Sequence, residues 1–359
     1  MSQLYRRLLQ SVPSSPENVE GHIQELKWSL FSNPCPKEYR GLVWKVLLNL
    51  HHVSASCYIS LVHRGPSALD DKIRSDTFRT MTTDASFLEH VSEDMLIRVL
   101  NAFVWISKES TKTGDTSEEL QLRAALKHDA CVSELTYVQG MNVLAAPFLM
   151  VLPEMEAFFA FSDFVWRVCP LYVHPTLKGV HCGIKLVDMS LRVLDPELYG
   201  YMMGKGLSAN MYAFPSVLTF SACTPPLSEL LRLWDVMFAF GFHLNILFIV
   251  AQLALIRDNI MASSSPAKLL RKLPPLEADM IIKLAGASCK KLPRDLYTQL
   301  VRHLHDENVV DALVQVGSTA FDGAGNNRPS ETLPAFMQEA RNFSMDSIRR
   351  KRPARGGGC

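Results

Sequence analysis

Residues 236–256 read VMFAFGFHLNILFIVAQLALI, and the interpretation of this apolar stretch decides the fold class. Its length would suffice to cross a lipid bilayer as a helix. The stretch contains His243, Asn245 and Gln252, however, and it begins directly after Asp235. A helix that is apolar on all sides is either a membrane span or a core helix of a large protein. Polar side chains in its first half, with helical sequence around it, favour a buried core helix and predict no membrane span.

The sequence around this stretch has mostly helical periodicity. Apolar side chains recur at helical spacings in 17–31, and residues 92–106 start with Ser92 as a candidate N-cap, followed by two acids. Further helices are expected at 37–50, 156–168, 178–194, 227–239, 244–260, 277–288 and 294–305. We find no sustained alternation of apolar and polar residues, no hairpin turn and no long repeat. The fold class is therefore predicted to be all-α.

Composition excludes several classes of protein. The chain has 359 residues, of which 48% are hydrophobic, so it can bury a sizeable core and is not disordered as a whole. The 37 Lys and Arg residues against 36 Asp and Glu residues give a formal charge of +1, which argues against a nucleic-acid-binding protein. Five of the basic residues lie in RRKRPAR, residues 349–355, which leaves 32 basic against 36 acidic residues elsewhere. The body is thus mildly acidic.

The cysteines indicate a reducing compartment and no metal centre. All eight are scattered, without a C-x-x-C pair and without the Cys/His spacing of a zinc site. The N-terminal sequence MSQLYRRLLQSVPSSPE has too short an apolar run for a signal peptide. We therefore expect free thiols in a cytoplasmic protein.

Changes in composition suggest how the chain is divided. Residues 1–29 are expected to form a helical lead-in, 30–315 a single large domain, and 316–359 a low-order tail. Within the domain, residues 107–130 begin with many Ser, Thr and charged residues and are predicted to be an exposed insertion with a short helix. The basic end of the tail is either a nuclear-import or acidic-surface signal or a disordered solubilising end.

Three short motifs follow one another along the chain. They are Arg40-Gly-Leu-Val-Trp44, Ile73-Arg-Ser-Asp76-Thr-Phe-Arg79 and Tyr137-Val-Gln139, with Trp234-Asp235 further on. In this order, R-x-x-x-W, I-x-x-D-x-x-R and Y-x-Q resemble the three signature motifs of the TBC domain, the GTPase-activating module for Rab-type small GTPases. The resemblance covers roughly residues 30–305. It implies one multi-helix domain whose partner is a small GTPase of the Rab or Ras type.

Longer phrases resemble one subgroup of that family. IRSDTFRT, LIRVLNAFVW and LRLWDVMFAFGFHLN look like the fungal mitotic-checkpoint subgroup of the budding-uninhibited-by-benzimidazole type. This resemblance implies a GTPase-activating protein that restrains mitotic exit or septation signalling. It also implies a scaffold subunit at the spindle pole body, with which the chain would form a bipartite complex. The basic tail leaves nuclear access open.

The resemblance assigns the chemistry to Arg79 and Gln139. GTP hydrolysis develops charge on the transferring phosphoryl group, and a guanidinium inserted from a partner stabilises it. Arg79 matches the family's arginine finger, and Asp76 would lie on the same side of a helical turn and hold it. Gln139 matches the glutamine finger, whose amide orients the attacking water. Tyr137, two residues away, would share its side of an extended segment.

The other motif residues are interpreted as supporting or architectural. Ile73 supports the finger motif, Trp44 is expected to be buried, and Arg40 is expected to pair with a carboxylate or a backbone oxygen. Trp234 and Asp235 are expected to be core and helix-terminus residues. No metal or cofactor of the chain's own is implied, since the partner GTPase would carry GTP and Mg²⁺.

Alternatives to a GTPase-activating protein remain open. The chain could be a non-catalytic TBC-fold scaffold or the GTPase-binding subunit of a checkpoint complex. A helical adaptor unrelated to GTPases would require the three motifs to coincide by chance. The 107–130 segment lies between the two fingers, and it either folds outward, so that they converge, or covers the site and gates it. The sequence does not identify the GTPase, because the surface that selects it is not a short motif.

Overall fold

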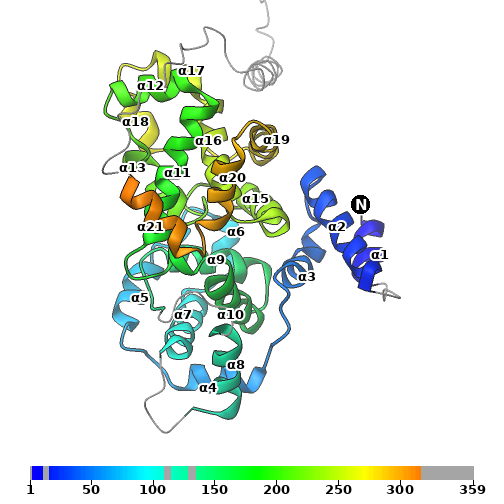
Figure 1. Ribbon diagram of the computed structural model, residues 1–359. Helices are drawn as coiled ribbons and strands as arrows, with labels where there is room; N and C mark the ends of the chain where they lie inside the picture. Colours follow the sequence, from blue (N-terminus) through cyan, green and yellow to red (C-terminus); the bar gives the residue numbers. More distant parts are fainter. Residues whose placement is uncertain (1, 11–15, 109–114, 128–134, 317–359) are drawn as a thin grey trace, which may run out of the picture.

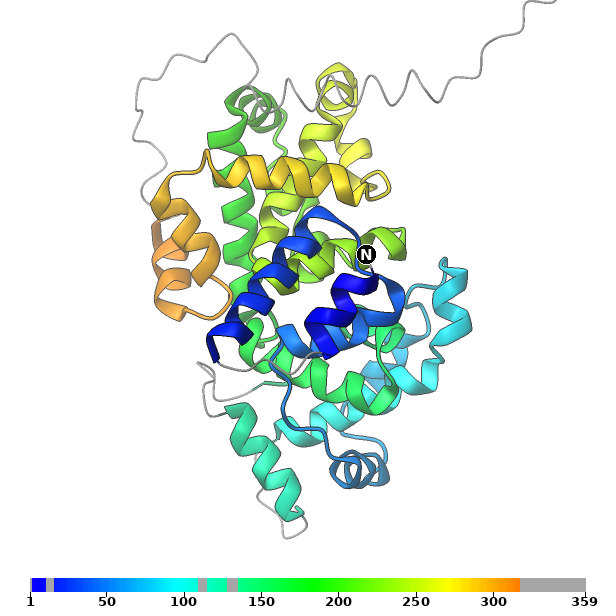
Figure 2. The ribbon, with the colours of Figure 1, turned by 90° about the vertical axis from the view of Figure 1, so that its right-hand side faces the viewer.

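The computed structural model describes residues 2–10, 16–108, 115–127 and 135–316, and Figures 1 and 2 show it in two views. Every regular element in these ranges is a helix, so the all-α prediction is confirmed. The N-terminal elements are α1 (Ser2–Gln10), α2 (Pro16–Ser32), α3 (Lys37–Leu47), α4 (Ala55–His63), α5 (Asp70–Thr77), α6 (Ala85–His90), α7 (Glu93–Ser107), α8 (Ser117–Lys127), α9 (Met141–Val151), α10 (Glu154–Asp163), the π-helix η1 (Phe164–Val168) and the 3-10 helix η2 (Pro170–Tyr172). The C-terminal elements are α11 (Lys178–Leu194), α12 (Pro196–Gly204), α13 (Ala209–Tyr212), α14 (Phe214–Leu218), α15 (Leu227–Phe240), α16 (Leu244–Leu255), α17 (Arg257–Ala262), α18 (Pro266–Arg271), α19 (Ala278–Cys289), α20 (Arg294–Arg302) and α21 (Glu307–Val316).

The helices form two stacked groups. In Figure 1, α4, α5, α7, α8, α9 and α10 occupy the lower part, where α7 packs against α4, α5, α9 and α10. The upper part is built around α11 and α16, with α19 packed on α16. Both α2 and α3 pack on α15, so the N-terminal helices lie against an element that is distant in sequence. The tail with its basic end lies outside the described residues.

The apolar stretch 236–256 is two helices and not one. It comprises the end of α15 and all of α16, and the turn between them includes Gly241 with a φ of 114°. A Cβ at Gly241 would lie 2.5 Å from Nδ1 of His243, so this turn requires glycine. Asn245 and Gln252 are buried, as expected for a core helix. No helix within the described part of the chain is long and apolar enough to cross a membrane.

The start of one predicted helix agrees with the structure, whereas the ends of two others differ from it. The Ser92 hydroxyl accepts a hydrogen bond from the Met95 amide at 3.3 Å, so the expected N-cap of α7 is present. The helix expected at 244–260 ends at Leu255, and α17 starts anew at Arg257. The helix expected at 156–168 continues α10 into the π-helix η1. Long apolar runs predict that helices exist better than they predict where helices end.

Aromatic side chains join the two groups of helices. Trp44 of α3 lies 5.9 Å from Trp234 of α15 and 5.7 Å from Phe148 of α9, between ring centroids. Phe164 of η1 and Phe238 of α15 pack into the same cluster. Each such pair contributes roughly 0.5–1.5 kcal/mol beyond its buried area. The first and last described thirds of the chain therefore share one core.

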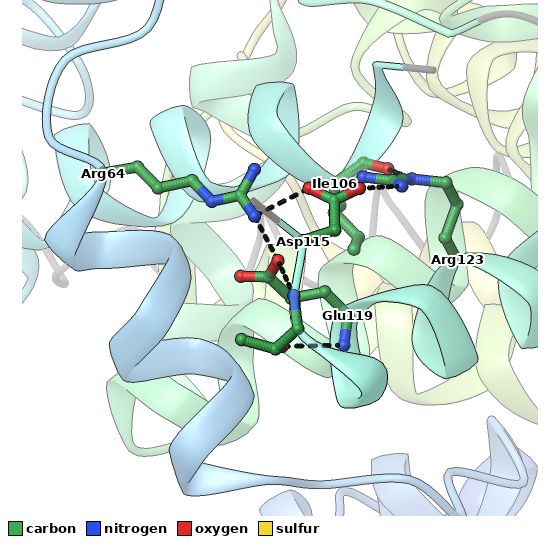
Figure 3. Close-up of polar contacts among 6 residues, drawn as sticks. Arg64, Ile106, Asp115, Glu119 and Arg123 are labelled. Carbon is green, nitrogen blue, oxygen red and sulfur yellow. Dashed lines mark hydrogen bonds and ion pairs between the residues drawn. The ribbon is translucent and has the colours of Figure 1, made fainter. Parts of the chain in front are cut away.

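Charged side chains attach α8 to α4 and α7, as Figure 3 shows. Arg64, just after α4, forms ion pairs with Asp115 at 2.8 Å and with Glu119. Arg123 pairs with Asp115 at 2.6 Å and donates to the backbone oxygen of Ile106 at 3.0 Å. Glu119 is fully buried and the Asp115 side chain is 7% exposed, and two positive charges face these two negative ones, which limits the cost of burial.

This attachment refines the prediction of an exposed insertion at 107–130. The expected short helix is present as α8, but Leu122 and Leu126 on it are buried against the helical body. The apolar face is hard to recognise in the sequence, because charged residues, which form the ion pairs of Figure 3, lie among its apolar positions. Residues 109–114 and 128–134, on either side, lie outside the described residues.

Candidate functional site

Arg79 lies in the turn that joins α5 to α6 and points into solvent. Its side chain is 58% exposed, and its Nη2 donates to Oδ1 of Asp76 at 2.9 Å. Asp76, in the last turn of α5, is itself buried. The guanidinium carbon lies 6.0 Å from the ring centroid of Phe78, whose side chain is 63% exposed. The contact expected between Asp76 and Arg79 from their spacing of three is present.

Tyr137 holds the second oxygen of the same carboxylate. Its hydroxyl donates to Oδ2 of Asp76 at 2.9 Å, and its side chain is buried. Burial, followed by the negative charge of Asp76, holds the pKa of Tyr137 well above its ordinary value of 10. The phenol therefore remains a proton donor near neutral pH. Because both of its oxygens are hydrogen-bonded, the Asp76 carboxylate cannot rotate freely, and it holds the Arg79 guanidinium in one orientation. Ile73, one turn earlier in α5, is fully buried.

Gln139 lies in the turn that leads into α9, and it is exposed. Residues 135–138 have no regular secondary structure and residues 139–140 form a turn. Tyr137 is buried and Gln139 is exposed, so the two side chains do not share one side of an extended segment as expected. The turn continues through Gly140, whose φ is 102°. A Cβ there would also lie 3.0 Å from Cδ2 of Leu218, so the residue after the glutamine has to be glycine.

Asn142, which belongs to none of the three sequence motifs, connects the two turns. Its Nδ2 donates to the backbone oxygen of Asp76 at 3.2 Å and to Oγ1 of Thr80 at 2.9 Å. Its Oδ1 accepts from the amide of Gly140 at 3.2 Å. The available signal was a lone polar side chain at the start of the otherwise apolar helix α9. The structure thus brings the Arg79 turn and the Gln139 turn together through Asp76 and Asn142.

Arg40 and Trp44 form a separate network on Asp235. Arg40 donates to both carboxylate oxygens, from Nε at 3.0 and 3.2 Å and from Nη2 at 3.0 Å, and it also reaches the backbone oxygen of Cys35 at 3.3 Å. The Trp44 indole donates to Oδ1 of Asp235 at 2.8 Å. Trp44 is fully buried, and Arg40 pairs with both a carboxylate and a backbone oxygen, which are the two kinds of partner expected for it.

Asp235 corrects one expectation. It lies in the interior of α15 and is fully buried, so it is not a helix-terminus residue. Burial raises the pKa of Asp235, and the neighbouring Arg40 and Trp44 oppose that rise. Trp234 is a core residue as expected, with its indole bound to the backbone oxygen of Phe220 at 3.0 Å.

A cleft runs beside the Arg79 turn. It has a volume of about 320 Å³ and is lined by Arg79, Met81 and Asp84 on one side and by Cys223 and Leu230 on the other. A second cleft of about 390 Å³ shares Asp84 with it. Within the described residues, no group of three His, Cys, Asp or Glu side chains could hold a metal ion. The site therefore offers an exposed cation that lines a cleft, and an exposed amide on the turn that Asn142 connects to it.

The chain is similar in sequence and in fold to known proteins. Residues 37–261 match the family described as the Rab-GTPase-TBC domain. The chain is 42% identical to Cell division control protein 16 of Schizosaccharomyces pombe, over 84% of this chain and 94% of that protein. It is 37% identical to Mitotic check point protein BUB2 of Saccharomyces cerevisiae, over 83% of this chain and 97% of that protein. The crystal structure of the Ypt/Rab-GAP domain of Gyp1p shares the fold, with a TM-score of 0.60 at 15% identity over 79% of this chain and 96% of that one.

Proposed function

The chain belongs to the Rab-GTPase-TBC domain family, and from this premise we propose that Arg79 and Gln139 complete the catalytic site of a small GTPase in trans. One observation supports this proposal above the others. A buried carboxylate, Asp76, holds an exposed arginine through one nitrogen, and the same network fixes the turn that carries an exposed glutamine. A buried carboxylate in a fixed position keeps the guanidinium oriented toward solvent, where a bound GTPase can reach it, and prevents it from folding back onto the protein surface.

Arg79 would stabilise the charge that develops during phosphoryl transfer. A guanidinium remains charged and offers planar, forked donors that match phosphate oxygens. Among the described residues, Asp76 is the one hydrogen-bond partner of Arg79, through Nη2, so Nε and Nη1 are available to a ligand. The arginine supplied by other GTPase activators accelerates hydrolysis by roughly 10³- to 10⁵-fold.

Gln139 would orient the attacking water. Its amide can donate one hydrogen bond and accept another, which a water in line with the γ-phosphate requires. Its exposure leaves the amide open to a partner. The bound GTP and Mg²⁺ would belong to the GTPase, and the chain would contribute no cofactor of its own.

The relatives' names suggest the cellular setting. The similar proteins are named for cell division control and the mitotic checkpoint, and with the subgroup resemblance this supports our proposal that the chain acts in the control of mitotic exit or septation. In this proposal it acts in the cytoplasm at the spindle pole body, as one half of a complex with a scaffold subunit. A non-catalytic GTPase-binding role is the alternative that the experiment below separates.

Phosphate release from a panel of GTP-loaded small GTPases tests the proposal, with and without candidate scaffold proteins. We expect Arg79→Ala and Gln139→Ala to slow release from the matched GTPase, the former by roughly a thousandfold. Arg74→Ala is the matched control, since Arg74 is also exposed and also pairs with an aspartate of α5, Asp70, at 2.7 Å. Full activity in a folded Arg79→Ala protein would contradict the proposal. GTPase binding without acceleration by the wild-type chain, alone or with a scaffold, would favour the non-catalytic role.

A further inference from the structure

Asn142 is the one side chain in the described part of the site that bonds to both finger-bearing turns. It is 5% exposed and occupies the second position of α9. Of its three hydrogen bonds, one reaches the end of α5 at Asp76, one reaches the Arg79 turn at Thr80, and the third reaches the Gln139 turn at Gly140. Thr80 is buried as well, so water does not compete freely for these groups.

The partners fix which way the amide faces. The backbone oxygen of Asp76 can only accept, and the amide of Gly140 can only donate, so Nδ2 must face Asp76 and Oδ1 must face Gly140. An aspartate at position 142 would lack the donors, and an aliphatic residue would lack both functions. A glutamine would add a methylene to a buried position. Asparagine is therefore the residue that satisfies both turns at this length.

Helix capping alone does not account for these contacts. A capping side chain near the start of a helix accepts from the free amides of that helix. Asn142 accepts from one amide, that of Gly140, and donates to the last turn of α5 at Asp76 and to the turn after it at Thr80, more than sixty residues away. Asp76 and Tyr137 make a parallel connection between side chains, whereas Asn142 joins the two backbones directly.

We propose that Asn142 is a positioning residue that sets the separation of Arg79 from Gln139. The inference rests on the function proposed above, because the separation matters only if both side chains act on one GTPase. Arg79 precedes Thr80, whose hydroxyl accepts from Asn142, and Gln139 precedes Gly140, whose backbone amide donates to Asn142, so each finger is next in the chain to a residue that Asn142 binds. A misplacement of about 1 Å at a reacting centre costs roughly a hundredfold in rate.

Kinetics and hydrogen–deuterium exchange test the proposal together. The assay uses the full chain and the small GTPase that the phosphate-release panel shows to be most strongly activated. We expect Asn142→Ala to lower kcat roughly a hundredfold while KM changes less than about threefold, because binding surfaces remain and alignment is lost. Thr80→Val conserves shape but removes the hydroxyl that accepts from Asn142 at 2.9 Å and donates to the backbone oxygen of Asp76 at 3.2 Å, and it should lower kcat by roughly three- to tenfold. Exchange in peptides covering residues 74–82 and 136–142 should accelerate in Asn142→Ala.

Asn245→Ala is the matched control. Asn245 is also a buried asparagine that donates to a backbone oxygen, that of Ser216, and accepts from a side chain, that of Ser221. Its loss should reduce stability without lowering the kcat of the folded fraction. If Asn142→Ala fails to fold, the Thr80→Val kinetics decide the question.

The outcomes separate this inference from the proposed function. Loss of activity in Arg79→Ala and Gln139→Ala, with kcat unchanged in both Asn142→Ala and Thr80→Val, would overturn the positioning role alone. A drop in kcat for Asn245→Ala as large as that for Asn142→Ala would reduce Asn142 to a general structural residue. Full activity in Arg79→Ala would overturn the proposed function, and the positioning role with it.

Discussion

Asp76 and Asp235 each hold one arginine and one aromatic donor, but they leave the two arginines in different states. Asp235 binds Arg40 through two nitrogens and Trp44 through its indole, and the arginine side chain is 13% exposed. Asp76 binds Arg79 through one nitrogen and receives the hydroxyl of Tyr137, and this arginine is 58% exposed. The same three kinds of group, a carboxylate, a guanidinium and an aromatic donor, therefore form a largely buried network around Arg40 and a network that leaves Arg79 exposed.

The number of bonds and the degree of burial decide which role each network can have. The bidentate pair engages Nε and Nη2 of the largely buried Arg40 and ties α3 to α15. A pair with one bond fixes the direction of the arginine but leaves donors for a ligand. The comparison predicts that changes in the Asp235 network lower stability, whereas changes in the Asp76 network lower activity.

The largest effect is expected from neutralising the two aspartates. Asp235→Asn leaves Arg40 without its counter-charge in a buried setting and should lower the free energy of unfolding by about 3–5 kcal/mol. Asp76→Asn, beside an exposed arginine, should cost about 1–2 kcal/mol in stability and slow phosphate release at least tenfold. Urea denaturation and the GTPase assay measure the two quantities. Equal losses of stability in the two variants would break the comparison.

Conservative replacement of the arginines comes next. Lysine retains the charge but lacks the planar fork, so Arg79→Lys should lower kcat roughly a hundredfold, equivalent to about 3 kcal/mol in the barrier, with stability nearly unchanged. Arg40→Lys should do the reverse, with a loss of about 1–3 kcal/mol in stability and a normal kcat for the folded fraction. A large drop in kcat for Arg40→Lys would assign Arg40 to the active surface.

Local parts of both networks could be predicted from the sequence. The spacing of three between Asp76 and Arg79 predicts their contact, and the R-x-x-x-W motif predicts a buried tryptophan with a paired arginine. These expectations depend on one helical turn or on hydrophobicity, which a short window of sequence contains. The helices at 92–106, 178–194 and 227–239 were predictable for the same reason.

Contacts between distant segments could not be predicted in this way. Arg40 and Asp235 are 195 residues apart, and no local pattern places Asp235 in the interior of α15 opposite α3. Asn142 looks like an ordinary residue of a turn until Asp76 and Thr80 are seen beside it. The buried side of α8 could not be recognised from the sequence, because the charge of Glu119 on that helix is neutralised by Arg64, which lies at the end of α4. Tertiary pairing, and not propensity, decides these positions.

The pH range in which the two networks can be compared is limited by buried histidines in the upper part of the fold. Burial lowers the pKa of His303 to about 3 and that of His243 to about 4, so both are neutral in the folded protein. The unfolded chain binds protons on them below pH 6.5, so stability is full above that pH and is lost as the pH falls. Burial raises the pKa of Asp188 to about 6, which opposes part of this loss.

We expect the free energy of unfolding to fall by about 2 kcal/mol between pH 7.5 and pH 5.5. His303→Gln should reduce that dependence by roughly two thirds, since it removes about 1.4 kcal/mol while the opposing contribution of Asp188 remains. Urea denaturation at the two pH values measures it. A stability that rises on acidification would mean that these histidines are protonated in the folded state. The comparisons of variants therefore belong at pH 7.5, where this effect is absent.

The aromatic donors give the smallest effect and the finest test. Tyr137→Phe removes the hydroxyl from Oδ2 of Asp76, and Trp44→Phe removes the indole N–H from Oδ1 of Asp235. Each should cost about 1–2 kcal/mol in stability, because a buried carboxylate loses one donor. Only Tyr137→Phe should also lower kcat, by roughly tenfold, since the freed carboxylate can rotate and take Arg79 with it. If the two variants lower stability equally and neither changes kcat, then Asp76 does not need its second anchor, and the backbone contacts of Asn142 alone hold the arginine in place.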